Sequence, residues 1–388
     1  MYLSAVRSNL NLLMYSGDRD VGRGRLGAFH STLTGMAPCW DRIDVLTPGH
    51  KEASPAVLLD NVYIHPSPRS RFVQSRFVVD MVAKLVRERH YSIAISHDHG
   101  IFSNGFAAME IESRFGIPYI SEIHHVPGHP RAGSLKEFGQ KCLARYYISR
   151  ARNRATAFRA VNNTQMPSLL EAWGVPRDKI IILPSFYLDF DMFYPVDHVK
   201  ASWDVMFCGR LDSNKGLDLL VSAASIVTQV RPNTRFLIIG DGSRFGALES
   251  DLRKQGLTER FEIHRWLDSP YDLADCYRRS NLLLCTSYSE GGPRVCLEAM
   301  ACGTPVISTP VGIMPEVLSD GFGGRLVNLD ANNIASKVLE MLNNPLARNK
   351  MGSDANQIVQ SFNQDKTLTN YVRTYIRLAE ECERRGAF

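Results

Sequence analysis

The chain has no long apolar run and no paired cysteine spacing. Although 44% of its 388 residues are hydrophobic, no segment approaches the about 20 consecutive apolar residues of a membrane span. The N-terminal segment MYLSAVRSNLNLLMYS lacks the pattern of a secretory signal peptide. The eight cysteines are scattered, without metal-binding pairs, and several fall in expected core elements. These absences predict a cytoplasmic protein with reduced thiols.

Strong charge and repetition are also missing. The formal net charge of +5 is modest and no recognition motif accompanies it, which argues against nucleic acid as a partner. There is no internal repeat or low-complexity tract. Apolar runs such as RIDVLTP and YSIAISH alternate with helical patterns, and the length allows two full cores. The sequence therefore predicts an α/β protein of two domains.

The most informative stretch is SEGGPRVCLEAMACGTPVIS, which begins at Ser289. The preceding LLLCTS predicts a buried strand ending at Ser287, and Gly291 and Gly292 permit a tight turn. Pro293 suits the first position of the helix that follows. Unpaired N–H groups at such a helix start bind anions, so this turn is a candidate diphosphate site.

Two carboxylates flank that turn. Glu290 lies in the loop, where it can accept hydrogen bonds from sugar hydroxyls, and Glu298 lies more than a turn into the helix, within reach of a ribose diol. A second element, VMFCGRLDSNKGLDLL, places Gly209 and Arg210 after an apolar strand and Lys215 before a helix. A guanidinium fork and an ammonium beside one turn suit the charge that grows on a departing nucleoside diphosphate.

Together these elements resemble the retaining glycosyltransferases of family 4, and the resemblance covers nearly the whole chain. GRLDSNKG matches the family's G-R-L-x-x-x-K-G element, and Glu290 with Glu298 matches its E-x7-E element, followed by EAMACGTPVI. FLIIGDGSRFGALES resembles the family's next strand, turn and helix. The chain departs from the family after Pro184, where P-N-G-x-D is usual, and at Gly292-Pro293, where the family has F-G.

The resemblance implies the GT-B fold, in which two Rossmann-like domains face a cleft. We expect an acceptor-binding domain over residues 1–198 and a nucleotide-sugar-binding domain over residues 199–367. The last helix, over residues 368–388, should cross back to the first domain. The donor is expected to be a UDP- or GDP-sugar that binds without a metal or a further cofactor.

The first half carries weaker signals. In DRDVGRGRLG, Gly22 and Gly24 permit close backbone approach to the donor phosphate or the acceptor, and a purely structural loop is an equal alternative. In SEIHHVPG, the resemblance favours His124 over His125 as the histidine near the reacting sugar, and a structural histidine remains the alternative. The pair His97 and His99 is interpreted as structural, because no further metal ligand accompanies it.

Two further patterns are set aside. Asp189-Phe190-Asp191 has the form of a metal-binding D-x-D motif, but it is isolated and falls in the expected linker. The glycines that begin at Gly240 have the wrong spacing for a dinucleotide-binding fingerprint, which disfavours a dehydrogenase.

Basic residues cluster in the first half of the chain. Arg145, Arg150, Arg152 and Arg154 stand beside Tyr146 and Tyr147. Such a segment suits peripheral contact with the anionic inner face of a membrane, where a lipid-linked acceptor would be found, and a solvated helix face explains it equally well.

The sequence therefore predicts a retaining hexosyltransferase that moves a sugar from a nucleoside-diphosphate donor to a hydroxyl of a glycan or lipid-linked acceptor. By the resemblance, Arg210 and Lys215 stabilise the diphosphate and Glu290 orients the sugar. Glu298 holds the ribose, and His124 contacts the sugar across the cleft. The alternatives are a sugar-nucleotide epimerase or phosphorylase on the same fold, and a glycan-binding or scaffold protein without turnover.

Overall fold

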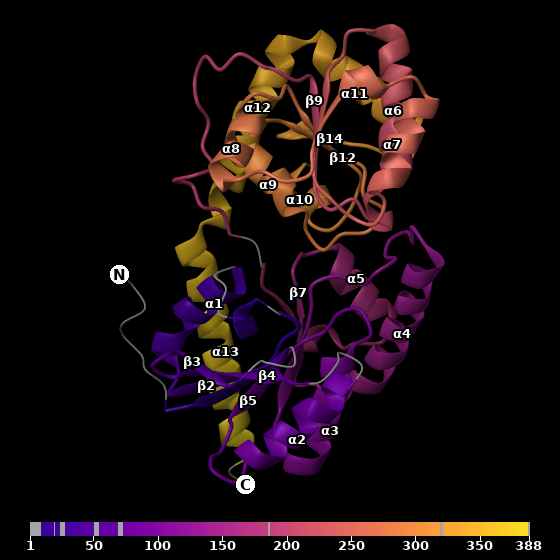
Figure 1. Cartoon of the computed structure of the whole chain (residues 1–388). Helices are drawn as coiled ribbons and strands as arrows, with labels where there is room; N and C mark the ends of the chain where they lie inside the picture. The colour runs from indigo at the N-terminus through magenta and orange to yellow at the C-terminus, as the bar shows by residue number, and fades with distance from the viewer. Residues whose placement is uncertain are drawn as a thin grey trace.

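The computed structural model describes residues 9–18, 20–23, 28–49, 54–68, 73–184, 187–318 and 321–386. Within these ranges the chain forms two α/β domains, one above the other in Figure 1. The last helix leaves the upper domain and runs down along the lower one. Among the described residues, no helix is both long and apolar enough to cross a membrane.

The first domain is built on one sheet, whose described strands follow the order β3-β4-β2-β1-β5-β6-β7-β8. Its neighbouring strands are parallel, except for the antiparallel pair of β3 and β4. The strands are β1 (Asn11–Tyr15), β2 (Arg42–Pro48), β3 (Ala56–Leu59), β4 (Val62–Ser67), β5 (Ile93–His97), β6 (Tyr119–Ile123), β7 (Ala157–Ala160) and β8 (Ile180–Ile182). The helices are η1 (Val21–Arg23), α1 (Ala28–Met36), η2 (Ala37–Cys39), α2 (Gln74–Leu85), α3 (Ser103–Phe115), α4 (Leu135–Ala151), α5 (Gln165–Ala172) and η4 (Arg177–Lys179).

Successive side chains of a strand point to opposite faces of a sheet, and β1 shows how this builds two cores. Leu13 and Tyr15 pack with α2, α3, α4 and α5 on one face, whereas Leu12 and Met14 pack with α1 on the other. Because both faces are covered, the central strands are mostly apolar on both faces instead of alternating regularly with polar residues.

The second domain repeats this plan with a parallel sheet in the order β11-β10-β9-β12-β13-β14. Its described strands are β9 (Val205–Cys208), β10 (Phe236–Ile239), β11 (Phe261–His264), β12 (Leu283–Cys285), β13 (Val306–Ser308) and β14 (Gly324–Leu326). The helices are η5 (Ser213–Lys215), α6 (Leu217–Val230), α7 (Phe245–Lys254), η6 (Thr258–Arg260), α8 (Pro270–Arg278), α9 (Arg294–Ala301), α10 (Met314–Val317), α11 (Ala331–Asn343), α12 (Pro345–Val359) and η8 (Gln360–Phe362).

The last helix, α13 (Gln364–Gly386), returns to the first domain. Its buried residues Val372, Tyr375 and Ala379 belong to the same apolar cluster as Leu12 and Met14 of β1. Fully burying a large apolar side chain contributes about 1.5–3 kcal/mol. The expected crossing of the last helix is therefore confirmed, and α13 forms part of the first domain's core.

Candidate functional site

The loop after β9 carries the two cations of the candidate diphosphate site. Arg210 is exposed, whereas the Lys215 side chain is largely buried at the end of η5. Gly216 is the N-cap residue of α6 (Leu217–Val230) with φ of 60°, and a Cβ there would lie 2.0 Å from the carbonyl oxygen of Thr286. Only glycine fits this left-handed, closely packed position, so the loop holds Lys215 in a fixed place.

Lys215 points to Glu290, the first carboxylate of the E-x7-E element. Its Nζ lies 2.5 Å from Oε1 of Glu290, and the same oxygen accepts hydrogen bonds from Ser287 Oγ at 3.2 Å and Asn214 Nδ2 at 3.4 Å. Burial alone would lower the pKa of Lys215, but the negative charge of Glu290 outweighs it and raises that pKa. The loops after β9 and β12 therefore meet in one charged cluster.

Glu298 lies in α9, on the buried side of the helix. Its Oε1 accepts a hydrogen bond from Arg294 Nε at 2.9 Å, and its Oε2 accepts one from the Tyr277 hydroxyl at 3.1 Å. Burial raises the pKa of this carboxyl, although Arg294 opposes the effect. Two local predictions need correction: β12 ends at Cys285 and not at Ser287, and Pro293 is the N-cap residue of α9 and not its first helical residue.

The turn after Glu290 touches the first domain. A Cβ on Gly291 would lie 2.2 Å from the carbonyl oxygen of His124, and Asn162 Nδ2 donates to the carbonyl oxygen of Gly291 at 3.3 Å. His125 is also close, since the same Cβ on Gly291 would lie 3.2 Å from the Cβ of His125. Both histidines therefore lie where the domains meet, and the choice of His124 over His125 remains a prediction.

Further hydrogen bonds join the domains on either side of this contact. Glu316 of α10 accepts from the backbone N–H groups of Asn163 and Thr164 at 2.7 and 3.0 Å. On the other side, Glu137 of α4 accepts from Ser213 Oγ at 2.6 Å. Ser213 is two residues from Lys215, so α4 directly supports the candidate diphosphate loop.

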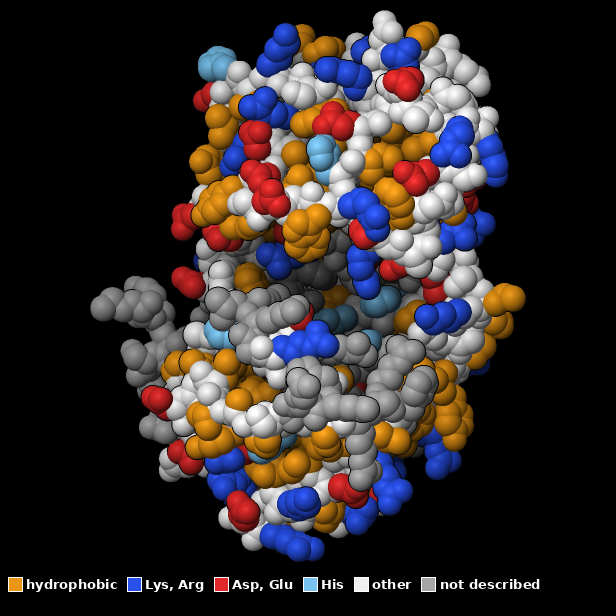
Figure 2. Space-filling view, in the orientation of Figure 1, with side chains coloured by type: hydrophobic (Ala, Val, Ile, Leu, Met, Phe, Trp, Pro, Cys, Tyr) orange, Lys and Arg blue, Asp and Glu red, His pale blue; other side chains and the backbone are white. Residues whose placement is uncertain are grey.

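A cavity of about 400 Å³ opens on the first domain's side of the interface between the two domains. Figure 2 shows a hollow between the two domains, with histidine side chains at its edge. The described lining residues come from the carboxyl ends of the first sheet's strands, from the segment after β8, and from α1, α9 and α13: Ser16, Gly17, Asp18, Phe29, Thr32, His97, Asp98, His99, Glu122, His124, His125, Arg159, Pro184, Tyr187, Arg294, Thr367, Leu368 and Tyr371.

Each of the two domains matches a known protein family. Residues 195–358 match the family described as glycosyl transferases group 1, and residues 28–185 match the glycosyl transferase 4-like domain. A D-inositol 3-phosphate glycosyltransferase of Arthrobacter is 26% identical over 84% of this chain and 82% of its own length. An uncharacterized glycosyltransferase of Methanocaldococcus jannaschii is 25% identical over 82% of this chain and 86% of its own.

The chain belongs to the group 1 glycosyltransferases. Solved structures agree on the fold. Sucrose-phosphate synthase from Thermosynechococcus elongatus superposes with a TM-score of 0.77 at 19% identity, over 95% of this chain and 99% of that one. Anabaena HepE, solved in complex with UDP and glucose, superposes with a TM-score of 0.73 at 18% identity, over 95% of this chain and 100% of that one. The predicted GT-B fold is confirmed.

Of the two glycines predicted in the first domain, Gly22 lies among the described residues of this glycosyltransferase. Gly22 lies in η1, where a Cβ would meet Thr47 Oγ1 at 2.8 Å, and it is not among the described lining residues. Gly24 lies outside the described residues. In the second domain, Gly209 lies against the Lys215 side chain, so a Cβ there would contact Nζ at 3.3 Å.

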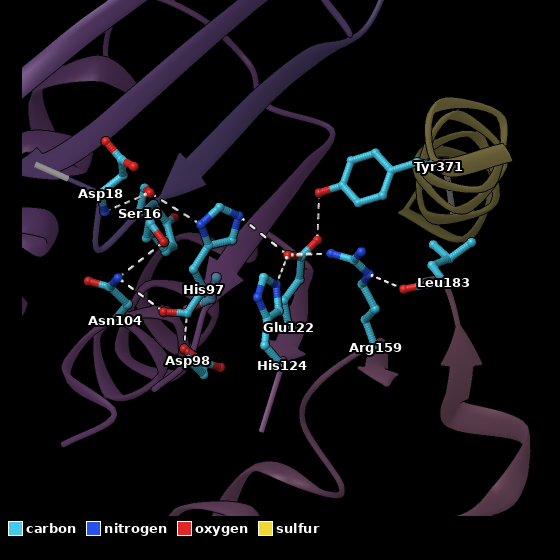
Figure 3. Close-up of polar contacts among 12 residues, drawn as sticks. Ser16, Asp18, His97, Asp98, Asn104, Glu122, His124, Arg159, Leu183 and Tyr371 are labelled. Carbon is cyan, nitrogen blue, oxygen red and sulfur yellow. Dashed lines mark hydrogen bonds and ion pairs between the residues drawn. The ribbon is translucent and has the colours of Figure 1, made fainter. Parts of the chain in front are cut away.

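An ionic network that was not predicted from the sequence lies at the base of the cavity. Glu122 of β6 lies 2.8 Å from Nη1 of Arg159 on β7, and it accepts a hydrogen bond from the Tyr371 hydroxyl of α13 at 2.6 Å (Figure 3). The available signal was a charged residue inside each of the apolar strands YISEI and AFRA. A buried charge in a central strand requires a partner of opposite charge or a hydrogen-bond donor or acceptor. A charged residue in such a strand is therefore a signal of a buried polar network.

Within the described ranges, no group of three or more His, Cys, Asp or Glu side chains has the arrangement of a metal site. Asp189 lies in the segment between the two sheets, where its Oδ1 accepts a hydrogen bond from the backbone N–H of Asp191 at 3.0 Å.

Proposed function

We propose that this glycosyltransferase moves a hexose from a nucleoside-diphosphate sugar to a hydroxyl of a glycan or lipid-linked acceptor, with retention of anomeric configuration. The main supporting observation is the contact of Lys215 with Glu290, in which a cation lies beside the carboxylate that we propose to bind the sugar. HepE, which shares the fold, was solved with UDP and glucose, and this supports a nucleotide sugar as donor.

Each donor group has a candidate partner. Arg210 and Lys215 would stabilise the diphosphate, because an oxyanion gains most from preorganised positive charge as it leaves. The backbone at Gly209, Gly291 and Gly292 would let the phosphates approach closely. Glu290 would orient the sugar, and the ligand's hydroxyls would share this carboxylate with Lys215.

Glu298 would bind the ribose. Its carboxylate is already held by Arg294 and Tyr277, so its orientation is fixed before the nucleotide arrives. Arg294 also lines the cavity of the first domain, and it therefore connects the ribose site with the expected acceptor side.

For retention, we favour a same-face substitution in which the leaving phosphate accepts the proton of the acceptor hydroxyl, as the family resemblance implies. Glu122 is one of two buried carboxyl groups that line the cavity, the other being Asp98. The two oxygens of Glu122 are engaged by Arg159 and by two tyrosine hydroxyls. These contacts disfavour Glu122 as a covalent nucleophile.

A thermal-shift screen with UDP, GDP and their sugars, followed by NMR analysis of the product anomer, tests the proposal. A nucleotide at 100 times its dissociation constant should raise the unfolding free energy by about 2.7 kcal/mol. Lys215→Ala is the matched control and should lose the shift for the diphosphates. If no nucleotide stabilises the protein, a glycan-binding role is favoured, and donor conversion without an acceptor would indicate an epimerase or phosphorylase.

Helix α4 supports peripheral membrane contact as part of this proposal. Its outer face exposes Leu135, Phe138 and Tyr146, with the exposed basic residues Lys136 and Arg145 beside them in the sequence. Arg150 is exposed on the last turn. Apolar side chains flanked by cations suit the interface of an anionic bilayer.

The structure reduces the number of arginines in the predicted basic segment that can contact a membrane. Arg154 donates to Glu112 at 2.6 Å and to the Met109 carbonyl oxygen at 2.6 Å, so its charge is already paired. Arg145 and Arg150 are exposed on the outer face and remain the main candidates.

Co-sedimentation with anionic and neutral vesicles tests this surface. Arg145→Glu/Arg150→Glu should weaken binding to anionic vesicles at low salt. Arg253→Glu/Lys254→Glu, which reverses the same charge on exposed residues of α7, should not. Binding should fade between 0.1 M and 1 M salt, as the screening length falls from about 10 Å to about 3 Å. No binding by the parent protein would contradict membrane contact and favour a soluble glycan acceptor.

A further inference from the structure

Glu122 is held from three sides in the core of the first domain. It is 1% exposed on β6, and Nη1 of Arg159 lies 2.8 Å from its Oε2. Oε1 accepts hydrogen bonds from the hydroxyls of Tyr371 and Tyr375 on α13. Arg159 is itself fixed, since its Nε donates to the Leu183 carbonyl oxygen at 2.9 Å. The carboxylate therefore has one orientation.

Two histidine rings of the cavity face the same carboxylate. Nε2 of His124 lies 3.3 Å from Oε2 of Glu122, and Nε2 of His97 lies 3.4 Å from it (Figure 3). Burial would raise the pKa of Glu122, but Arg159 and the two histidines outweigh burial and hold that pKa well below its usual range. An ionised carboxylate only accepts hydrogen bonds, so a ring nitrogen that bonds to it carries the proton.

We propose that Glu122 is a positioning residue that holds His124 in the tautomer with the proton on Nε2. The other nitrogen, Nδ1, is then the acceptor that this ring offers to a hydroxyl of the bound sugar. The role of this tautomer in turnover rests on the proposed function. The assignment of the tautomer itself does not. It also gives α13 a role at the site, because Tyr371 and Tyr375 orient the carboxylate.

His97 fits the same scheme and does not compete with His124 for a ligand. Its Nδ1 lies 3.2 Å from Ser16 Oγ, which donates to it when Nε2 carries the proton. Burial lowers the pKa of His97 to about 4, so this ring is neutral at physiological pH. His97 has a protein partner on both nitrogens, whereas His124 is 47% exposed and lines the cavity.

The tautomer is measured directly by long-range ¹H–¹⁵N correlation NMR on protein with ¹⁵N-labelled histidine. His124→Gln and His97→Gln assign the two spin systems by loss of signal. We expect His124 to show the pattern of an Nε2–H imidazole. A pattern with the proton on Nδ1, or an equal mixture of both tautomers, would overturn the proposal, and this measurement needs no substrate.

Kinetic measurements distinguish a positioning role of Glu122 from a purely structural role of its ion pair with Arg159. Glu122→Gln/Arg159→Met removes both buried charges together, so that neither is left unpaired. It should lower kcat at least about tenfold, with the KM for the nucleotide sugar changed less than about threefold, because an oriented hydrogen bond to the reacting sugar is lost. The NMR pattern of His124 should change in the same variant.

The matched control is Glu112→Gln, which removes the carboxylate opposite Arg154 in the same domain, away from the cavity. It should leave kcat and the His124 tautomer unchanged. If the Glu122 double variant keeps the parental kcat and tautomer, Glu122 is structural only. If the parent turns over no nucleotide sugar, the proposed function fails, whereas the NMR result still decides the tautomer.

Discussion

Asp98 gives a sharp prediction because it is a buried carboxyl whose described hydrogen-bond partners are neutral hydroxyl groups. It is 1% exposed at the end of β5, on the wall of the cavity. Its oxygens accept hydrogen bonds from the hydroxyls of Ser96 at 2.6 Å, Ser121 at 2.5 Å and Tyr147 at 2.8 Å. Burial outweighs these bonds, and together with the nearby charge of Glu122 it raises the pKa of Asp98 to about 7.

The raised pKa fixes the sign of a stability change. Between pH 3.8 and about 7 the folded state binds one more proton at Asp98 than the unfolded state, so stability falls as the pH rises through this window. At 1.36 kcal/mol per pH unit, the whole change is roughly 4 kcal/mol, lost by about pH 8. Asp98→Asn keeps the shape but cannot ionise. Its stability relative to the parent should therefore rise by about this amount between pH 4 and pH 8.

Urea unfolding followed by circular dichroism, at several pH values from 4 to 8, measures this difference. The difference between variant and parent is the useful quantity, since all other titrating groups are common to both. Asp80→Asn is the control, because the Asp80 side chain is 59% exposed on α2, and its difference from the parent should be flat. A flat difference for Asp98→Asn as well would refute the reasoning.

The remaining predictions concern turnover. Lys215→Ala and Arg210→Ala should each lower kcat at least ~10²-fold in folded protein, because both charges act as the diphosphate leaves; a near-parental rate in either would contradict its assignment. Activity should survive exhaustive EDTA treatment, and full loss restored by Mg²⁺ or Mn²⁺ would reverse this expectation. Glu290→Gln should chiefly lower kcat, whereas Glu298→Gln should chiefly weaken nucleoside-diphosphate binding in calorimetry. An unchanged affinity in the latter would remove Glu298 from the ribose site.

The second domain was the more predictable half, because its site is built from residues close in sequence. Lys215 follows its strand within one loop, and Glu298 lies eight residues after Glu290. Local patterns of strand, glycine turn and helix therefore carry most of the geometry. The errors at Ser287 and Pro293 are errors of boundary, where backbone geometry decides and residue preference does not.

The first domain's cavity could not be derived in the same way. Glu122 accepts a hydrogen bond from Tyr371, which lies 249 residues further along the chain. Nothing in the local pattern around either residue identifies the other, since their contact depends on α13 returning across the sheet. The family resemblance predicted that return, but the register of α13 against β6 decides which hydroxyls reach the carboxylate, and that register is a property of the packed core.

The departure of this chain from the family's E-G-F-G turn also finds a physical account. Gly291 is confined from both sides: a Cβ there would reach the His124 carbonyl oxygen at 2.2 Å, and a Cβ on Gly312 would reach the Gly291 carbonyl oxygen at 2.3 Å. This position therefore requires glycine for the domains to meet. Pro293, in contrast, is the N-cap residue of α9, where the lost N–H is not needed by the helix. The departure from the family pattern at Gly292-Pro293 therefore lies at positions where the turn tolerates a change. The contact between Gly291 and His124 is compatible with this sequence.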